Sequence, residues 1–110
     1  SKLEQKVFKL GRTPTTLNQQ LLILNELDIL KEFKKHDLSD VKLATLLSVI
    51  LNGDKDNIRK ALSTINTKDS KLKTSTNYAF VHKTFEDVEL KELAKKADLN
   101  FNKAKNSEEN

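Results

Sequence analysis

The chain of 110 residues contains no cysteine, methionine or tryptophan, and it has one proline, two glycines and one tyrosine. Because cysteine is absent, the sequence excludes disulfides, thiolate zinc sites and a cysteine nucleophile. The two glycines, Gly11 and Gly53, are too few for either common glycine-rich phosphate-binding loop. Aromatic residues make up 5% of the chain, so we do not expect an aromatic surface that stacks single-stranded bases.

Long hydrophobic runs are also missing. No apolar stretch approaches the roughly 20 residues that cross a bilayer as a helix, so we expect no membrane partner and a cytoplasmic location. The two histidines, His36 and His82, are far apart in sequence, and the carboxylates are spread along the chain without an evident pair. These observations predict neither an enzyme nor a metal site, and we expect no cofactor and no small-molecule substrate.

Basic residues are concentrated in one part of the chain. The net charge is +4. Residues 55–83 hold seven basic and two acidic residues, a balance of +5, whereas the segments on either side, 13–54 and 84–110, are each slightly acidic. A concentrated basic patch attracts polyanions by counterion release and by electrostatic steering. A lysine-rich surface that only interacts with solvent remains the alternative.

The first third of the chain has the spacing of helices. Residues 1–10 carry apolar side chains at helical intervals, and Gly11 ends that pattern. The run over 17–30 is too apolar for a surface helix, so we place it centrally in the core. Asp28 marks its end, and a turn or short helix continues through Lys35.

Several side chains predict where helices begin. The central helix begins either at Pro14, where no backbone N–H is needed, or at a capping box formed by Thr16 and Gln19. Ser39 suits the N-cap of the next helix, and Asp54 suits the N-cap of the helix after that.

The stretch from Val41 to Lys73 predicts two amphipathic helices joined by a tight turn. The first carries a wide stripe that we assign to the core: Val41, Leu43, Ala44, Leu46, Leu47, Ile50 and Leu51. Asn52 and Gly53 supply the left-handed stop. The second helix runs to about Ile65, and its apolar positions are Ile58, Ala61, Leu62 and Ile65. The two helices together predict a helix–turn–helix-like unit.

The last third predicts a basic loop followed by further helices. The loop covers 66–73 and lacks the alternation of a strand pair. Thr74 or Ser75 caps a helix whose apolar positions are Tyr78, Val81 and Phe85, and a second helical stretch covers Glu89 to about Phe101. We therefore predict a single all-α domain of five to six helices over residues 1–105, with a frayed polar tail over 106–110.

The second helix of the unit has the chemistry of a DNA-recognition helix. Asn57 and Arg59 offer the bidentate geometry that suits adenine and guanine edges. Side chains suited to phosphate contacts are Lys60, Ser63, Lys68, Lys71 and Lys73, and Lys83 belongs to the same basic segment. Fourteen residues separate Ala44 from Ile58, so the first helix is about one turn longer than in the usual compact unit.

The alternative to a DNA-recognition helix is that both helices only pack into the core and that the basic face has no specific partner. In that case the chain is a helical protein–protein interaction module without enzymatic activity. Its exposed apolar face would come from the 17–30 helix or the 78–101 region, and a homodimer is one candidate assembly.

The order of these segments resembles the C-terminal part of RteC-type regulators from conjugative elements of Bacteroides-like bacteria. The resemblance covers Phe8 to Phe85: a glycine-containing opening (FKLGRT), a leucine-rich helix (LNQQLLILNELDIL), a KLATLL helix, a basic second helix with its loop (NIRKALSTINTKDSKLK) and an aromatic-bearing helix. It implies a helical, winged-helix-like domain that binds double-stranded DNA and regulates transcription on a mobile element. By position it implies DNA contacts by Arg59, Lys60, Lys68, Lys71 and Lys73.

Overall fold

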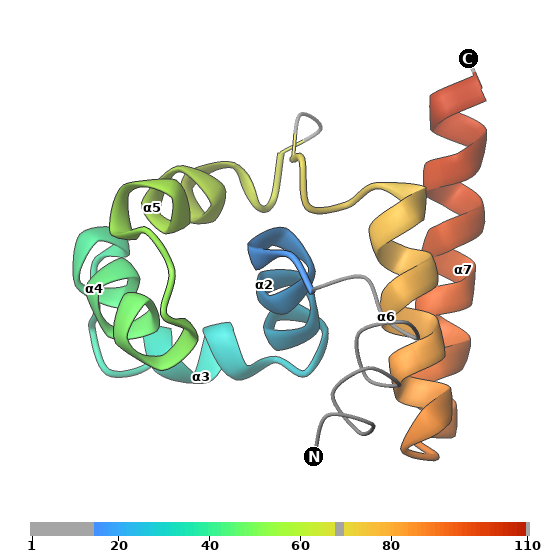
Figure 1. Ribbon diagram of the computed structural model, residues 1–110, viewed down its shortest axis with the longest axis horizontal. Coiled ribbons are helices and arrows are strands. Elements are labelled where there is room, and N and C mark those ends of the chain that lie inside the picture. The colour runs from blue at the N-terminus through green and yellow to red at the C-terminus, as the bar shows by residue number, and fades with distance from the viewer. Residues whose placement is uncertain (1–14, 68–69, 110) are drawn as a thin grey trace, which may run out of the picture.

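The computed structural model describes residues 15–67 and 70–109, and its regular structure over these ranges is entirely helical. The described helices are α2 (Leu17–Glu26), α3 (Ile29–Lys34), α4 (Asp40–Leu51), α5 (Lys55–Thr64), α6 (Ser75–Asp87) and α7 (Lys91–Glu109) (Figure 1). The predicted all-α domain of five to six helices is confirmed. The helix expected over 1–10 and the helix start at Pro14 lie outside the described residues.

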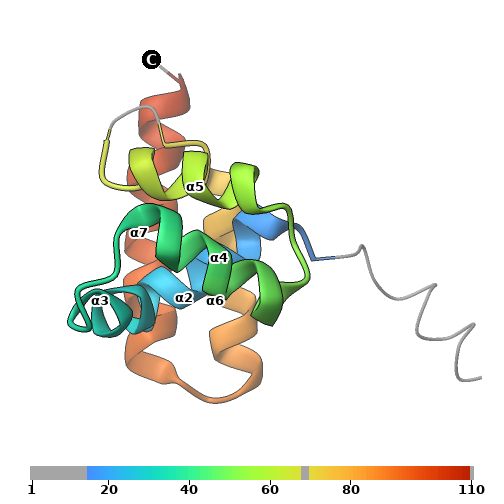
Figure 2. The same cartoon turned by 90° about the vertical axis from the view of Figure 1, so that its left-hand side faces the viewer.

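Helix α2 lies between two helical hairpins (Figure 1). On one side, α6 and α7 pack along each other. On the other side, the chain passes along α4 and returns along α5 in roughly the opposite direction (Figure 2). Leu21 and Leu22 of α2 are fully buried, and Asp28, with a positive φ of 60°, separates α2 from α3. The central position predicted for the apolar 17–30 run is therefore confirmed.

Short polar side chains start four of the helices as the sequence predicts. Thr16 and Gln19 form a capping box in which each side chain accepts the other's backbone N–H at 3.1 Å. Ser39, Asp54 and Thr74 each accept an N–H from the first turn that follows, at 3.3, 2.8 and 3.2 Å. These bonds satisfy donors that a helix leaves unpaired at its start.

One connected core joins the helices. It contains Leu21, Leu22, Leu30, Leu43, Ala44, Leu47, Ile58, Leu62, Ile65, Leu72, Tyr78, Val81, Phe85, Ala94 and Ala97. The predicted core positions on α6 are confirmed, because Tyr78, Val81 and Phe85 are all buried. The turn between α4 and α5 packs close to α2, since a Cβ on Gly53 would lie 3.1 Å from Leu17 Cδ1.

The apolar stripe predicted for α4 is only partly buried. Leu43, Ala44 and Leu47 lie in the core, and Leu51 is half-buried. Val41, Leu46 and Ile50, which we assigned to the core, are exposed, and so is Val49. An outer-layer helix contacts its neighbours along one side only, so a stripe this wide cannot be buried completely.

The prediction of a frayed tail over 106–110 is wrong for the part that the structure describes. Helix α7 continues to Glu109, because Glu108 hydrogen-bonds to Ser75 at the start of α6. No helix among the described residues is long and apolar enough to cross a membrane.

Candidate nucleic-acid interface

Helix α5 presents a polar face because two apolar residues fix its rotation. Ile58 is fully buried and Leu62 nearly so, and both point into the core that α5 shares with α4. The exposed side chains of the helix are Lys55, Asp56, Asn57, Arg59, Lys60 and Ser63. The exposure that we predicted for Asn57, Arg59, Lys60 and Ser63 is therefore present.

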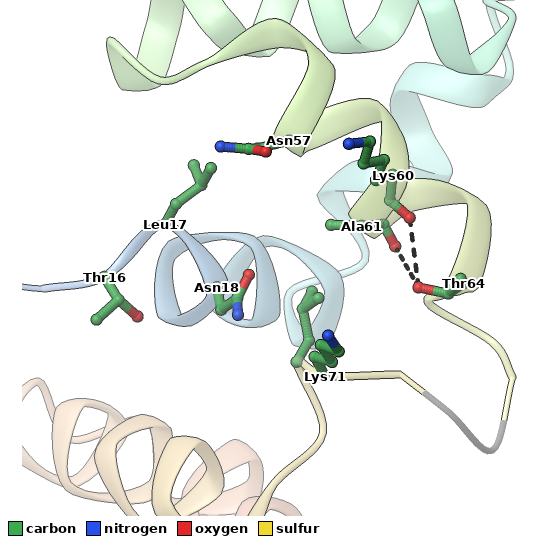
Figure 3. Close-up of a pocket in the computed structure, with 9 residues that line it drawn as sticks. Thr16, Leu17, Asn18, Asn57, Lys60, Ala61, Thr64 and Lys71 are labelled. Atoms are coloured by element: carbon green, nitrogen blue, oxygen red, sulfur yellow. Dashed lines mark hydrogen bonds between the residues drawn. The ribbon is translucent and has the colours of Figure 1, made fainter.

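The two residues proposed to read bases do not point the same way. Positions two apart on a helix differ by about 200° in direction, which places Asn57 and Arg59 on opposite flanks of α5. Asn57 lies on the flank toward α2, where it lines a cavity (Figure 3). The two side chains therefore cannot both face the bases from one orientation of the helix.

The cavity lies between α2, α5 and the loop before α6, and it encloses about 710 Å³. It is lined by Thr16, Leu17, Asn18, Asn57, Lys60, Ala61, Thr64, Lys71 and Leu72. In Figure 3, Asn57 and Lys60 extend from α5, and Asn18 and Lys71 lie across from them. Three of the predicted DNA-contacting residues, Asn57, Lys60 and Lys71, are thus brought together around one opening.

A buried anchor holds the basic loop in place. Leu72 is 1% exposed, and its carbonyl accepts a 2.9 Å hydrogen bond from the buried Nδ2 of Asn77 on α6. The neighbouring Lys71 is exposed and Lys73 is half-buried. The loop residues that the structure describes form turns without a strand, as their sequence pattern predicts. A β-wing, which the family resemblance implies, is not present in these residues.

Two other predicted residues, Lys83 and Ser63, make contacts elsewhere. Lys83 lies on α6, which packs against the other side of α2 from α5 (Figure 1). Its Nζ lies 3.4 Å from Asp87 Oδ1 in the same helix. The Ser63 hydroxyl donates to the Lys60 carbonyl at 2.8 Å. Lys68 lies outside the described residues.

The basic side chains of this region are not neutralised by ion pairs with described carboxylates. The ion pairs of residues 15–67 and 70–109 involve Lys34, Lys35, His82 and Lys83. Lys55, Arg59, Lys60 and Lys71 are not among them. No described carboxylate therefore pairs with these charges in place of an anionic partner.

The two histidines lie in different surroundings, and His82 lines a second cavity together with Glu86, Glu89 and Asp98. His36 is exposed. His82 packs between α6 and α7, with Nδ1 2.8 Å from the Ala94 carbonyl oxygen and Nε2 3.2 Å from Glu86 Oε1. Within the described part of the chain, no group of three or more histidine, aspartate or glutamate residues could hold a metal ion.

Sequence reasoning did not identify Asn18 and Thr16 as part of any site. Asn18 belongs to a helix that we assigned to the core, and Thr16 was assigned only a capping role. Nothing in the local pattern of either residue indicates a cavity, because the cavity exists only where α2 and α5 come together.

Comparison of the chain with protein-family models, with curated proteins and with solved structures gives no match. The resemblance to RteC-type regulators therefore stays a prediction.

Proposed function

We propose that this protein binds double-stranded DNA and regulates transcription. One observation carries the proposal: α5 is held by Ile58 and Leu62 while Arg59 and Lys60 extend from its exposed side, with Lys71 presented nearby by an anchored loop. A helix with one buried apolar stripe and one cationic polar face fits the major groove. Cationic side chains supply a large share of the affinity of a protein for DNA phosphates.

The opposite flanks of α5 suit different tasks. Arg59 is the residue that reaches a guanine edge, since its guanidinium matches the O6 and N7 acceptors in paired geometry. On the other flank, Lys60 and Lys71 bind phosphates and fix the position of the helix without reading sequence. Asn57 lies on that phosphate-binding flank. Recognition of the base sequence therefore depends on the contact that Arg59 makes with a base.

The family resemblance supports the same function. It points to a regulator from a mobile genetic element, which would act in the cytoplasm, where bacterial DNA lies. The basic balance of residues 55–83 agrees with a polyanionic partner.

The experiment is fluorescence anisotropy with random duplex DNA at about 50 and about 200 mM salt, a range in which phosphate-driven binding falls steeply. We compare the wild type with the double variant Arg59→Ala/Lys60→Ala. The control is Lys95→Ala/Lys96→Ala, which removes the same charge from exposed positions on α7.

We expect the α5 variant to bind at least tenfold more weakly and to reduce the slope of log affinity against log salt by about two. The α7 control should change both quantities less. Equal losses in the two variants would show that binding depends only on net charge, and the proposed interface would be wrong.

Self-association is a second candidate function, and the exposed face of α4 favours it. Val49 is 79% exposed, Ile50 57% and Val41 55%. The only charged side chain on this face is Lys42, so we propose a second copy of the chain as the occupant, meeting the same face across a two-fold axis. A dimer of this kind also suits the two-fold symmetry of many operators.

Sedimentation equilibrium tests this second candidate. The wild type should dimerise with rising concentration, and Val49→Ser/Ile50→Ser should stay monomeric. A wild-type protein that is monomeric at every concentration would exclude self-association through α4.

A further inference from the structure

The cavity between α2 and α5 has an apolar floor and a polar rim. Leu17, Ala61 and Leu72 supply aliphatic carbon from three separate segments of the chain. Its volume of about 710 Å³ is within the roughly 300–1,000 Å³ typical of sites for small organic ligands. The cavity therefore has room for a ligand with an apolar body.

Four polar side chains around the opening have no partner among the described residues. Asn18 and Asn57 make no side-chain hydrogen bond there, although the backbone N–H of Asn57 donates to the Asp54 carboxylate. Lys60 and Lys71 make neither an ion pair nor a side-chain hydrogen bond with a described residue. No described residue therefore occupies these two cations and two carboxamides, which lie where a ligand that enters the cavity would contact them.

The charge of the rim selects the ligand class. Two ammonium groups face an opening with no carboxylate among its described lining residues. A doubly charged anion matches two cations, and a planar or aliphatic body matches the floor. The carboxamides of Asn18 and Asn57 add donors and acceptors at the edge of such a body.

We propose that this cavity binds an organic phosphate monoester, with the phosphate between Lys60 and Lys71 and the organic body over Leu17 and Ala61. The binding itself does not depend on the proposed DNA-binding function. One consequence does: since Lys60 and Lys71 also belong to the DNA-binding flank, ligand and DNA compete for them, and the ligand acts as an effector that releases DNA.

The test is a titration of the full, isotope-labelled chain with phenyl phosphate. Nuclear magnetic resonance records the chemical shifts of the backbone amides at each ligand concentration. We expect saturable shifts in the first turn of α2, in α5 and around Leu72. Lys60→Gln and Lys71→Gln should each weaken binding about tenfold, the usual loss for one charge-assisted hydrogen bond. Ala61→Leu should weaken binding as well, because it fills the floor without changing charge.

Three controls define specificity. Lys95→Gln/Lys96→Gln on α7 removes two charges elsewhere and should leave the affinity unchanged. Inorganic phosphate should bind more weakly than phenyl phosphate, because it cannot use the floor. Far-ultraviolet circular dichroism checks that each variant is folded. Shifts spread over all lysine-rich surfaces, or equal binding by the lysine variants, would overturn the proposal.

The two proposals fail in different ways. Loss of DNA from the complex on addition of phenyl phosphate would support the competition. If phenyl phosphate shifts the amide signals around the cavity but the protein does not bind DNA, the ligand site is supported and the proposed DNA-binding function is wrong. DNA binding without saturable phenyl phosphate shifts would overturn the ligand site alone.

Discussion

The carboxylate of Glu108, in the last turn of α7, accepts two hydrogen bonds from Ser75 at the first residue of α6. The Ser75 hydroxyl donates to Oε1 at 2.6 Å and the Ser75 backbone N–H donates to Oε2 at 2.8 Å. A negative charge at the N-terminus of a helix is favourable, because the helix dipole is positive there. This contact connects the two ends of the α6–α7 hairpin and explains why a polar C-terminal sequence is helical.

Replacing this carboxylate should change the acid stability of the protein. The hydrogen bonds from the Ser75 side chain and then from its backbone hold the pKa of Glu108 below its ordinary value of 4.5. A carboxyl group with a lowered folded-state pKa stabilises the fold above its unfolded pKa, and this stabilisation disappears as the pH falls through the folded value. We expect Glu108→Gln to be less stable than the wild type at neutral pH, with a smaller loss of stability on acidification.

Urea unfolding measured from neutral to acidic pH checks this difference. Glu109→Gln is the matched control, because Glu109 is exposed and makes no hydrogen bond with a described residue. If the two variants show the same pH dependence, the Glu108–Ser75 contact does not stabilise the fold.

The single tyrosine should ionise only in strong alkali. Burial, and secondly the negative charge of Glu26, raise the pKa of Tyr78 from 10.0 to about 12. Because the folded state favours the neutral phenol, the contribution of Tyr78 to stability should be constant below pH 10.0 and should fall as the pH rises toward about 12. Glu26→Gln should lower the Tyr78 pKa by a small amount, since burial is the larger cause.

Ultraviolet absorbance of tyrosinate follows this titration without interference from other tyrosines. Circular dichroism at the same pH values reports whether the chain is folded. Tyrosinate formation near pH 10 in a fully helical protein would show that Tyr78 is accessible to solvent.

The buried amide of Asn77 should be important for the loop that carries Lys71. Asn77→Ala leaves the Leu72 carbonyl without its 2.9 Å hydrogen bond, which should cost roughly 1–3 kcal/mol of unfolding free energy. The backbone N–H of Asn77 still donates to the Thr74 cap, so the start of α6 is retained. Thr76→Ala, at an exposed neighbouring position, should change stability by less than about 0.5 kcal/mol. Urea unfolding compares the two variants, and equal losses would contradict a specific role for the Asn77 amide.

The two sides of α4 should respond differently to substitution. Leu47 is fully buried, so Leu47→Ala should cost roughly 2–5 kcal/mol through lost burial and a cavity. Val49 is 79% exposed, and Val49→Ser should cost about 0.5 kcal/mol or less. Unfolding experiments at low protein concentration, where self-association does not contribute, measure both. A large loss for Val49→Ser would mean that this face is covered within the monomer.

Much of the fold follows from local sequence patterns. The caps at Ser39 and Asp54 and the left-handed Asn52 each depend on residues within one turn, so the sequence was sufficient to predict them. The start of the central helix was left open between Pro14 and the capping box of Thr16 and Gln19, and the structure shows the capping box. The burial of Tyr78, Val81 and Phe85 also follows, because i, i+3, i+7 spacing places them on one side of α6 whatever that side contacts.

Features that depend on contacts between distant segments were decided by the tertiary structure and could not be predicted from local sequence patterns. The position of α4 in an outer layer determined that Val41, Leu46 and Ile50 are exposed, although their spacing is that of core residues. The contact from Glu108 to Ser75 spans 33 residues, and it makes the predicted polar tail helical. The cavity that joins Asn18 to Lys60 and Lys71 depends on the distance between α2 and α5. Side-chain spacing fixes the direction in which a residue points, but only packing between distant segments fixes what it meets.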